Sequence, residues 1–378
     1  MNSLGIDRDP AKTRVVVAMS GGVDSSVVAA MLKTEGYDVI GITLQLYDRN
    51  SELHRNSTCC SAQDLDDARQ VADMLRIPHH VLNVEDHFHE EVVERFADSY
   101  LAGATPVPCV DCNRSIKFKD MLKATEELGA DLLATGHYVI SQKLDDGQYA
   151  LFRAADIKRD QSYFLYATSP QQLARLRFPL GQSKNKEEIR SKARQLGLSI
   201  ADKADSQDIC FISNGRYSDL IRKLRPGAAK KGEIVHIDGR ILGEHDGIIH
   251  FTVGQRRGLG ISSAEPLYVI RLDAENARVI VGPKEALASH HIYVGSVCWY
   301  GSPDAAHRPE GIKIAARVRS TRPPKEGILH LEADGQAVIE LSAPEEGVSP
   351  GQACVFYDSS APYARVLGGG TILKDRMS

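Results

Sequence analysis

The hydrophobic pattern of the first forty residues predicts a strand, a turn and a helix. Residues 15–17 are three consecutive valines, a run typical of a fully buried strand. Gly21 and Gly22 interrupt this pattern, and apolar residues then recur at helical spacing until Gly36. Such an order of elements directs free backbone N–H groups and a helix N-terminus at one point, where a phosphate can bind.

The pattern continues as alternating strands and helices, which predicts an α/β domain with a parallel sheet. Leu44, near the end of the second strand, is expected beside the first turn, where the base of a nucleotide could lie. Gly136 and His137 end a later strand and should reach the same carboxyl edge of the sheet. Strands are expected at 38–47, 79–86 and 131–138, a hairpin turn at 144–149, and helices at 63–76, 88–101, 113–129 and within 171–197.

Beyond residue 214 the period changes to short apolar runs separated by Gly and Asp turns. We interpret residues 213–287 as a small β-rich middle domain and residues 288–378 as a C-terminal β-barrel. Residues 1–212 form the α/β domain. Three domains agree with the length of 378 residues, which is more than one core comfortably supports.

Composition excludes several classes of protein. No apolar run approaches the roughly 20 residues that a membrane span needs, so no membrane partner is expected. The N-terminus lacks an apolar signal core, which favours a cytoplasmic location. Seven cysteines, an odd number, argue against a disulfide framework and for reduced thiols, some of them reactive.

The net charge of −4 does not indicate a nucleic-acid-binding protein, but the basic residues are unevenly distributed. Residues 222–231 and residues 313–325 each contain five basic residues and no acidic one. These runs could form a solvated face of the protein, or they could bind the phosphates of a polyanionic partner.

The glycine turn carries its own chemistry. Ser20, Ser25 and Ser26 supply hydroxyl groups, and the Asp24 carboxylate could hold a metal ion that bridges phosphate oxygens. The lysine of a Walker A loop is missing, which argues against transfer of a γ-phosphate. An ordinary turn of an α/β sheet is the alternative.

A second region of interest is residues 105–122. Its prolines favour a helix that begins only at Asn113, so Cys109 and Cys112 are expected in a loop before the helix N-terminus, where the thiolate form is favoured. This spacing alone fits a redox pair, half of a metal site or structural thiols. Four histidines at 79, 80, 87 and 89 match no common metal-ligand spacing and are interpreted as surface or core residues.

Motifs along nearly the whole chain resemble those of the bacterial tRNA-specific 2-thiouridylases. SGGVDSS at 20–26 is similar to the loop of the PP-loop ATP pyrophosphatase superfamily, whose members cleave ATP to AMP and pyrophosphate. C-N-x-x-I-K-F at 112–118 and S-x-x-I-C-F-I at 206–212 resemble the narrower family. Further similar stretches lie at 134–138, 160–165, 251–260 and 349–357.

The resemblance implies ATP- and Mg²⁺-dependent 2-thiolation of the wobble uridine in tRNAs for Lys, Glu and Gln. Adenylation turns the uracil C2 oxygen into a leaving group. By resemblance, Cys210 receives persulfide sulfur from a sulfur-relay donor protein and presents it to C2. Cys112 is then the nucleophile that releases this sulfur or resolves the thiolated intermediate, which leaves a transient Cys112–Cys210 disulfide.

The resemblance also assigns binding residues. The implied ATP-binding residues are Ala18, Met19, Ser20, Gly21, Gly22, Val23, Asp24, Ser25, Leu44 and Gly136. The implied tRNA-binding residues are Val107, Pro108, Cys109, His137, Arg159, Asp160, Gln161 and Gln352. The target base must leave its stack to reach the segment at 107–109.

Two positions depart from the family pattern. Cys109 stands where many members have Asp, and Arg159 stands where Lys is usual. With Cys112 and Cys210, Cys109 could form a three-thiolate site for a [4Fe–4S] cluster, although the persulfide relay is the favoured interpretation. Two other functions stay open at this point: an amidotransferase-linked ligase of the same superfamily, and an RNA-binding protein with a degenerate nucleotide domain.

Overall fold

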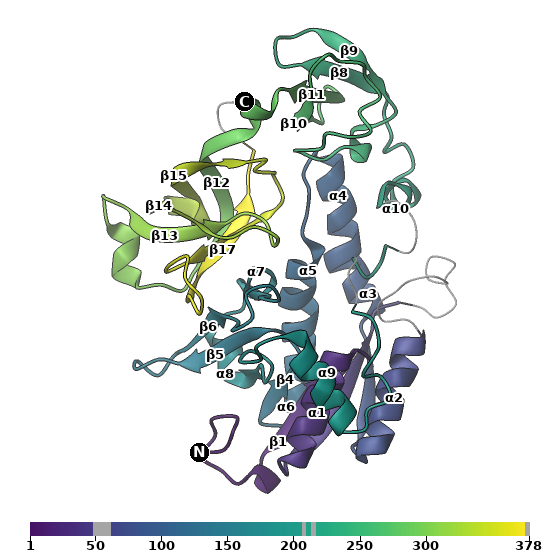
Figure 1. Ribbon diagram of the computed structural model, residues 1–378, viewed down its shortest axis with the longest axis vertical. Helices are drawn as coiled ribbons and strands as arrows, with labels where there is room; N and C mark the ends of the chain where they lie inside the picture. The colour runs from purple at the N-terminus through teal and green to yellow at the C-terminus, as the bar shows by residue number, and fades with distance from the viewer. Residues whose placement is uncertain (48–61, 206–208, 213–216, 375–378) are drawn as a thin grey trace. The chain divides into compact units, whose positions relative to one another are not determined.

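A computed structural model describes residues 1–47, 62–205, 209–212 and 217–374 (Figure 1). The chain divides into two compact units. The first unit comprises residues 1–91, 109–214 and 361–366, and the second comprises residues 92–108, 215–360 and 367–378. No helix in the described parts of the chain is long and apolar enough to cross a membrane.

The first unit is built on a five-stranded parallel sheet with the order β3-β2-β1-β4-β7. Its strands are β1 (Arg14–Ala18), β2 (Asp38–Gln45), β3 (His79–Asn83), β4 (Leu132–Ala134) and β7 (Leu176–Arg177). From β1 the chain first adds β2 and β3 on one side and later adds β4 and β7 on the other side. The order in which strands are added therefore switches at β1, although all the strands stay parallel. A ligand site is expected at the carboxyl end of such a strand.

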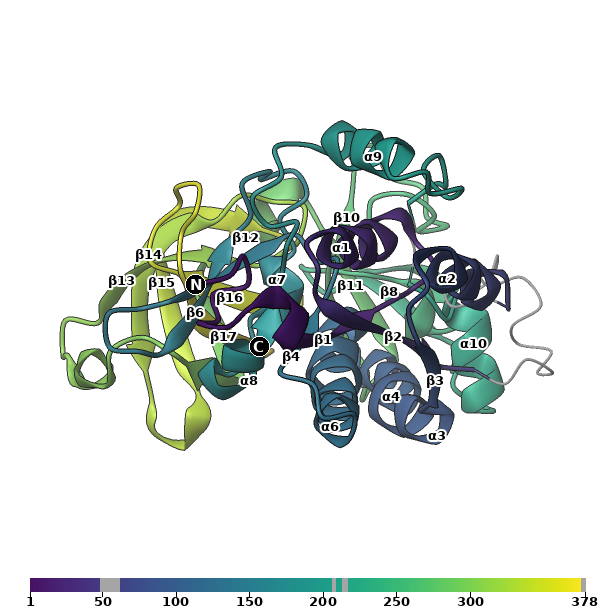
Figure 2. The ribbon, with the colours of Figure 1, turned by 90° about the horizontal axis from the view of Figure 1, so that it is seen from below.

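Helices cover both faces of this sheet. Figure 2 shows α1 (Val23–Thr34), α2 (Ala62–Leu75) and α9 (Lys186–Gln195) on one face and α6 (Met121–Glu127) on the other. The valines at 15–17 are completely buried because the strand has apolar neighbours on both faces. The predicted α/β domain with a parallel sheet is confirmed.

The cysteine-bearing helix begins earlier than the sequence predicts. A first turn, α5 (Pro108–Asp111), leads into the π-helical segment η4 (Cys112–Asp120) and then into α6. Pro108 is the first residue of α5, where its missing N–H leaves no hydrogen bond unmade. The prediction that Cys109 and Cys112 lie in a loop before the helix is therefore wrong, since both belong to its first turns.

Other elements differ from the expected bounds. The helix expected at 88–101 is divided into α3 (Glu85–Phe88), the π-helical η3 (His89–Glu94) and α4 (Arg95–Leu101). The strand expected at 131–138 is only β4. The sequence pattern missed the short strand β7 and the helix α10 (Tyr217–Leu224).

A hairpin and two short helices complete the first unit. The hairpin consists of β5 (Val139–Lys143) and β6 (Tyr149–Arg153), as the turn at 144–149 predicts, and is followed by α7 (Ser162–Leu165) and α8 (Pro170–Arg175). Arg153 on β6 forms a buried ion pair with Asp160 at 3.1 Å. Asp160 also accepts hydrogen bonds from the backbone N–H groups of Ala154 and Ser162.

The second unit contains two β structures. One is a four-stranded sheet with the order β10-β11-β8-β9, and the other is a closed barrel with the order β12-β15-β14-β13-β16-β17. This arrangement confirms the predicted β-rich region and C-terminal barrel. The bounds are β8 (Gly232–His236), β9 (Ile241–His245), β10 (Tyr268–Asp273), β11 (Arg278–Gly282), β12 (Ala288–Trp299), β13 (Ile312–Arg317), β14 (Lys325–Leu331), β15 (Ala337–Glu346), β16 (Ala353–Tyr357) and β17 (Val366–Ile372).

The basic run at 313–325 has partners within the second unit. Arg317 is buried and donates to backbone carbonyl groups, and Arg319 donates to the carbonyl of Gly347 at 2.7 Å. Arg322 and Lys325 both form ion pairs with the buried Glu345. These four side chains are used in contacts within the second unit, so the run is not simply a free surface for phosphates.

The Arg153–Asp160 pair generates a stability prediction. Asp160→Asn should lower the free energy of unfolding by about 3–5 kcal/mol, because it leaves the Arg153 charge buried without its partner. Urea unfolding measures this loss, and Asp145→Asn at the exposed hairpin is the matched control. An Asp160→Asn protein as stable as the control would contradict the structural role.

Candidate active site

The turn between β1 and α1 is held by hydroxyl groups of the helix that follows it. The Ser25 hydroxyl accepts a hydrogen bond from the Ser20 N–H and donates one to the Gly22 carbonyl, both at 3.1 Å. The Ser26 hydroxyl donates to the same carbonyl at 2.9 Å. Gly22 is the N-cap of α1 and supplies no side chain to the first N–H groups. The N-terminus of α1 can therefore offer these groups to an anion.

Two glycines allow other segments to pack closely against this turn. Gly21 has a φ of +72°, and a Cβ there would lie 2.0 Å from the backbone oxygen of Asp64 on α2. At Gly136, beyond β4, a Cβ would lie 2.9 Å from the backbone nitrogen of Ser25. Neither position has room for a side chain, so the turn is tightly enclosed by α2 and by the segment after β4.

A network of charged groups surrounds Asp24, in the first turn of α1. Its carboxylate accepts hydrogen bonds from the Lys186 ammonium group, at 2.7 and 2.8 Å, and from the Tyr138 hydroxyl, at 2.7 Å. Burial and the neighbouring Asp24 carboxylate raise the pKa of Tyr138, so its hydroxyl stays a donor. Lys186 also contacts Asp205 at 2.8 Å, and Arg159 binds Asp205 at 2.9 Å.

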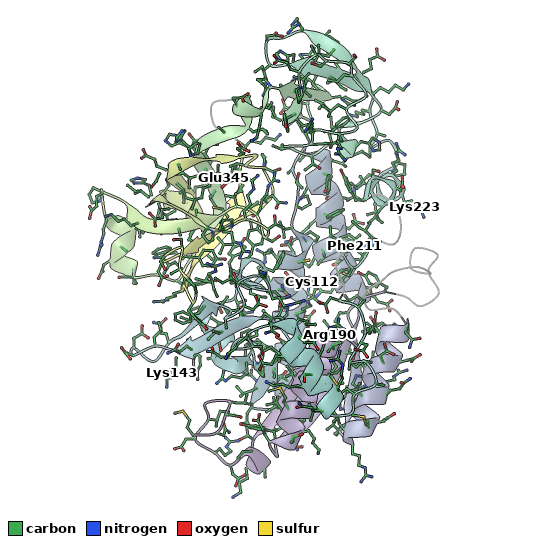
Figure 3. The ribbon with its side chains drawn as sticks, viewed as in Figure 1. Cys112, Lys143, Arg190, Phe211, Lys223 and Glu345 are labelled. Atoms are coloured by element: carbon green, nitrogen blue, oxygen red, sulfur yellow. The ribbon has the colours of Figure 1, made fainter. Side chains whose placement is uncertain are left out.

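The charges of this network are stabilised by their partners. Burial would raise the pKa of Asp205, but the hydrogen bonds from Lys186 and Arg159 hold it below its ordinary value. Arg190 lies 3.6 Å from the same carboxylate and is labelled in Figure 3. Five charged side chains, which come from four parts of the sequence, thus meet beside the start of α1.

A second ammonium group binds the turn itself. The Lys203 Nζ donates to the Gly21 carbonyl at 2.9 Å and to the carboxylates of Asp64 and Asp67 at 2.7 and 2.5 Å. Burial would lower the pKa of Lys203, yet these hydrogen bonds raise it, so the group is cationic. Lys186, Lys203 and Asp205 belong to none of the recognised sequence motifs. The polar run at 202–205 is a signal for Lys203 and Asp205, but no local pattern distinguishes Lys186.

The ten implied ATP-binding residues all lie in the first unit. Residues 18–25 form the end of β1, the turn and the start of α1. Leu44 is buried near the carboxyl end of β2, and Gly136 follows β4. The fold therefore brings the carboxyl ends of three neighbouring strands to one edge, as expected for a nucleotide site.

The three cysteines of interest belong to the first unit, and none of them is joined in a disulfide. Cys112, which is labelled in Figure 3, is buried at the start of η4, whereas Cys109 is exposed. Cys210 is half-buried and lies 3.1 Å from the Tyr47 hydroxyl. Among the described residues, no three His, Cys, Asp or Glu side chains are grouped as metal ligands. This arrangement does not fit a three-thiolate cluster.

The implied tRNA-binding residues are divided between the two units. Val107, Pro108 and Gln352 lie in the second unit, where the Gln352 amide donates to the Thr105 carbonyl at 2.9 Å. The other five lie in the first unit: Cys109, His137, Arg159, Asp160 and Gln161.

Several of these side chains already have protein partners. Asp160 is buried in its ion pair, and the Gln161 side chain accepts a hydrogen bond from the Tyr138 N–H at 2.8 Å. His137 is half-buried and shares a hydrogen bond with the Thr135 hydroxyl at 2.8 Å. Burial, together with the charge of Lys117, lowers the pKa of His137 to about 3, so the imidazole is neutral near pH 7.

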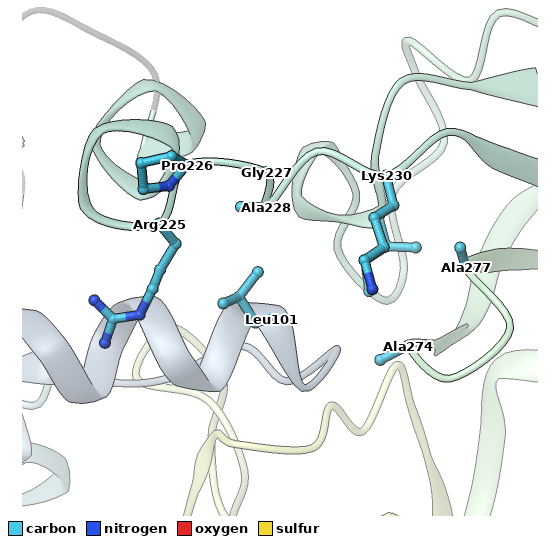
Figure 4. Close-up of a pocket in the computed structure, with 9 residues that line it drawn as sticks. Leu101, Arg225, Pro226, Gly227, Ala228, Lys230, Ala274 and Ala277 are labelled. Carbon is cyan, nitrogen blue, oxygen red and sulfur yellow. The ribbon is translucent and has the colours of Figure 1, made fainter.

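The second unit has a separate cavity of about 390 Å³ (Figure 4). Leu101, Ile248 and small residues of two turns line it, and Lys230 extends into it. Arg225 also lines the cavity, but its guanidinium group is bound by Glu94 at 2.5 Å and Asp98 at 2.8 Å. At the end of α10, part of the basic run at 222–231 thus forms ion pairs with Glu94 of η3 and Asp98 of α4.

Comparisons with known proteins identify the family. Family profiles described as a tRNA methyl transferase HUP domain, a tRNA methyl transferase PRC-barrel domain and an aminomethyltransferase beta-barrel domain match residues 13–214, 220–283 and 289–372. The chain is 60% identical over 376 residues to the "tRNA-specific 2-thiouridylase MnmA" of Methylorubrum extorquens (strain PA1), covering 98% of this chain and 96% of that protein. The chain belongs to the tRNA-specific 2-thiouridylase family.

A second relative agrees with this assignment, and one solved structure overlaps part of the chain. The protein of the same name from Bradyrhizobium sp. (strain BTAi1 / ATCC BAA-1182) is 59% identical over 374 residues, covering 98% of this chain and 94% of that protein. A solved 4-thiouridine synthetase–RNA complex with bound ATP is 20% identical, with a TM-score of 0.38, and covers 53% of this chain and 46% of that chain. This last overlap is too limited to support an argument about the 2-thiouridylase family.

The enclosed turn gives a prediction with a matched control. Gly21→Ala should lower the free energy of unfolding by about 2 kcal/mol or more, because it combines a left-handed backbone with a Cβ clash. Gly22→Ala should cost less than about 1 kcal/mol, since its φ is −93° and its nearest neighbour would lie 3.4 Å away. Urea unfolding without nucleotide measures both, and equal losses would contradict the packing described.

Proposed function

We propose that this protein is an ATP-dependent tRNA 2-thiouridylase that modifies the wobble uridine of tRNAs for Lys, Glu and Gln. The observation that carries the proposal is the 60% identity, over nearly its whole length, to a relative named as a tRNA-specific 2-thiouridylase. Cysteines that are not joined in a disulfide, and a helix N-terminus without a side-chain cap, support it within one unit. Family membership disfavours both an amidotransferase-linked ligase and a degenerate RNA-binding protein. We further propose that the enzyme works in the cytoplasm.

The first step is adenylation of the target base. The N–H groups at the start of α1 would bind ATP phosphates, and the Asp24 carboxylate is a suitable oxygen ligand for the accompanying Mg²⁺. The uracil C2 oxygen attacks the α-phosphorus, and pyrophosphate leaves. Lys186 and Lys203 lie beside the turn and would stabilise the negative charge on the departing phosphates.

The second step transfers sulfur. The terminal sulfur of a Cys210 persulfide attacks C2 and displaces AMP, which forms a C2–S–S–Cys210 linkage. The Cys112 thiolate then attacks the Cys210 sulfur, so that the S–S bond breaks and the other sulfur stays on C2. In the alternative order, Cys112 attacks the persulfide first and releases hydrosulfide, which attacks C2. Both orders produce a Cys112–Cys210 disulfide, which an external thiol reduces.

Of the residues proposed to bind tRNA, some side chains can contact it directly and others act through the protein backbone. Arg159 is partly exposed and can reach a phosphate while it keeps its ion pair with Asp205. Buried Asp160 would act by holding the backbone around it rather than by direct contact. Because protein–phosphate contacts release counterions, the affinity for tRNA should fall as the salt concentration rises.

The charged network predicts an effect on ATP use. Lys186→Gln should lower kcat/KM for ATP about tenfold or more, because it removes a buried charge that contacts the ligand site. Lys192→Gln is the matched control on the same helix, where the exposed pair with Glu188 should matter less than about twofold. Pyrophosphate release in the presence of tRNA measures both variants. Equal effects would remove Lys186 from the proposed site.

The thiol chemistry predicts that the two steps can be separated. Cys112→Ala and Cys210→Ala should both release pyrophosphate when mixed with ATP, Mg²⁺, a persulfide donor and an unmodified tRNA for Glu, yet form no 2-thiouridine. The reason is that adenylation uses the glycine turn and sulfur transfer uses the thiols. Mass spectrometry of digested tRNA detects 2-thiouridine, and Cys298→Ala in the second unit is the control. Thiolation by either variant would contradict the assigned roles.

A further inference from the structure

Cys210 has a neighbour that the sequence motifs do not include. The Tyr47 hydroxyl lies 3.1 Å from the Cys210 sulfur, although 163 residues separate the two in the chain. Tyr47 follows β2, so it stands at the carboxyl edge of the sheet, where the glycine turn also lies. Both residues are half-buried.

Aromatic packing fixes the direction of the Tyr47 side chain. Its ring meets the Phe88 ring edge-on at 5.3 Å, and Phe88 in turn contacts Phe211 at 6.0 Å. Phe88 and Phe211 are buried, and Figure 3 labels Phe211, the residue that follows Cys210. A hydrogen bond from the Ile212 N–H to the Ile209 carbonyl closes the turn that carries the cysteine. The same three rings therefore hold both partners of the contact.

We propose that Tyr47 is a positioning residue that holds the Cys210 sulfur for attack on an incoming persulfide. This inference rests on the proposed function and extends it to a residue outside the assigned site. A free thiol ionises near pH 8.5 and a phenol near pH 10, so the phenol keeps its proton when the thiolate forms. The hydroxyl then donates to the sulfur anion, and such bonds to charged groups are stronger than neutral ones.

The step that Tyr47 assists is balanced without an outside oxidant. The Cys210 thiolate attacks the terminal sulfur of a donor persulfide, and a new S–S bond forms at Cys210. The S–S bond of the donor breaks, and the donor cysteine leaves as a thiolate that takes a proton from solvent. The hydroxyl of Tyr47 keeps its proton throughout, so its part is to orient the nucleophile and stabilise its charge.

The test is persulfide transfer to Cys210 in the full-length chain. Glutathione persulfide is the probe, and peptide mass spectrometry at a fixed pH follows the loading of Cys210. Tyr47→Phe keeps the ring but removes the hydroxyl, and it should slow loading about tenfold. The kcat for 2-thiouridine formation should fall when sulfur transfer is rate-limiting, while KM for ATP and for tRNA stays unchanged. A merely structural role would not produce this split.

Tyr37→Phe is the matched control. It removes another hydrogen-bonded hydroxyl from the first unit, where Tyr37 contacts the Ser3 hydroxyl and the Leu4 N–H. This variant should load at the wild-type rate. If Tyr47→Phe melts below the assay temperature, Tyr47→His retains a ring N–H donor, and it should load faster than Tyr47→Leu, which has none.

The outcomes separate this inference from the proposed function. Equal loading by wild type and Tyr47→Phe, with equal kcat, would overturn the role of Tyr47 and leave the proposed function intact. A wild-type protein that thiolates tRNA without ever carrying sulfur on Cys210 would overturn the persulfide relay itself, and the role of Tyr47 with it. Slow loading confined to the Tyr47 variants would support both.

Discussion

The close approach of backbone segments around the glycine turn is the constraint on which the first unit depends. Gly21 lies against the backbone of Asp64, and Gly136 lies against that of Ser25. These contacts place α2 and the segment after β4 beside the N-terminus of α1. A parallel sheet provides the rest, because the carboxyl ends of its neighbouring strands share one edge.

Charge is distributed differently in the two units. In the first, Lys186 and Lys203 are held by carboxylates next to the turn, where an anionic ligand could exchange with those partners. In the second, Arg317, Arg319 and Arg322 donate to carbonyl groups and to Glu345 within the barrel region. A basic run in a sequence is thus an uncertain sign of phosphate binding, because buried acceptors can use the same cations.

The two cysteines given catalytic roles lie in contrasting surroundings. Cys112 is buried in the first turn of a π-helical segment, whereas Cys210 is half-buried in a turn between aromatic residues. A buried resolving thiol and a more open sulfur carrier suit the proposed order of events, since the carrier must meet an external donor. Irregular π-helical geometry is often found where a helix carries functional side chains.

The parallel sheet, the barrel and the glycine turn could all be predicted from the sequence, because each follows from a local period or from a backbone requirement that glycine alone meets. The predicted start of the cysteine-bearing helix was wrong. Proline disrupts the interior of a helix but fits its first turn, and Pro108 occupies that first turn. Tertiary structure alone decided that Lys186 meets Asp24, that Arg153 pairs with Asp160 and that Tyr47 reaches Cys210. Most of these partners are distant in the chain, and Arg153 and Asp160 have no local pattern that distinguishes them from exposed charged residues. Only packing brings each pair together.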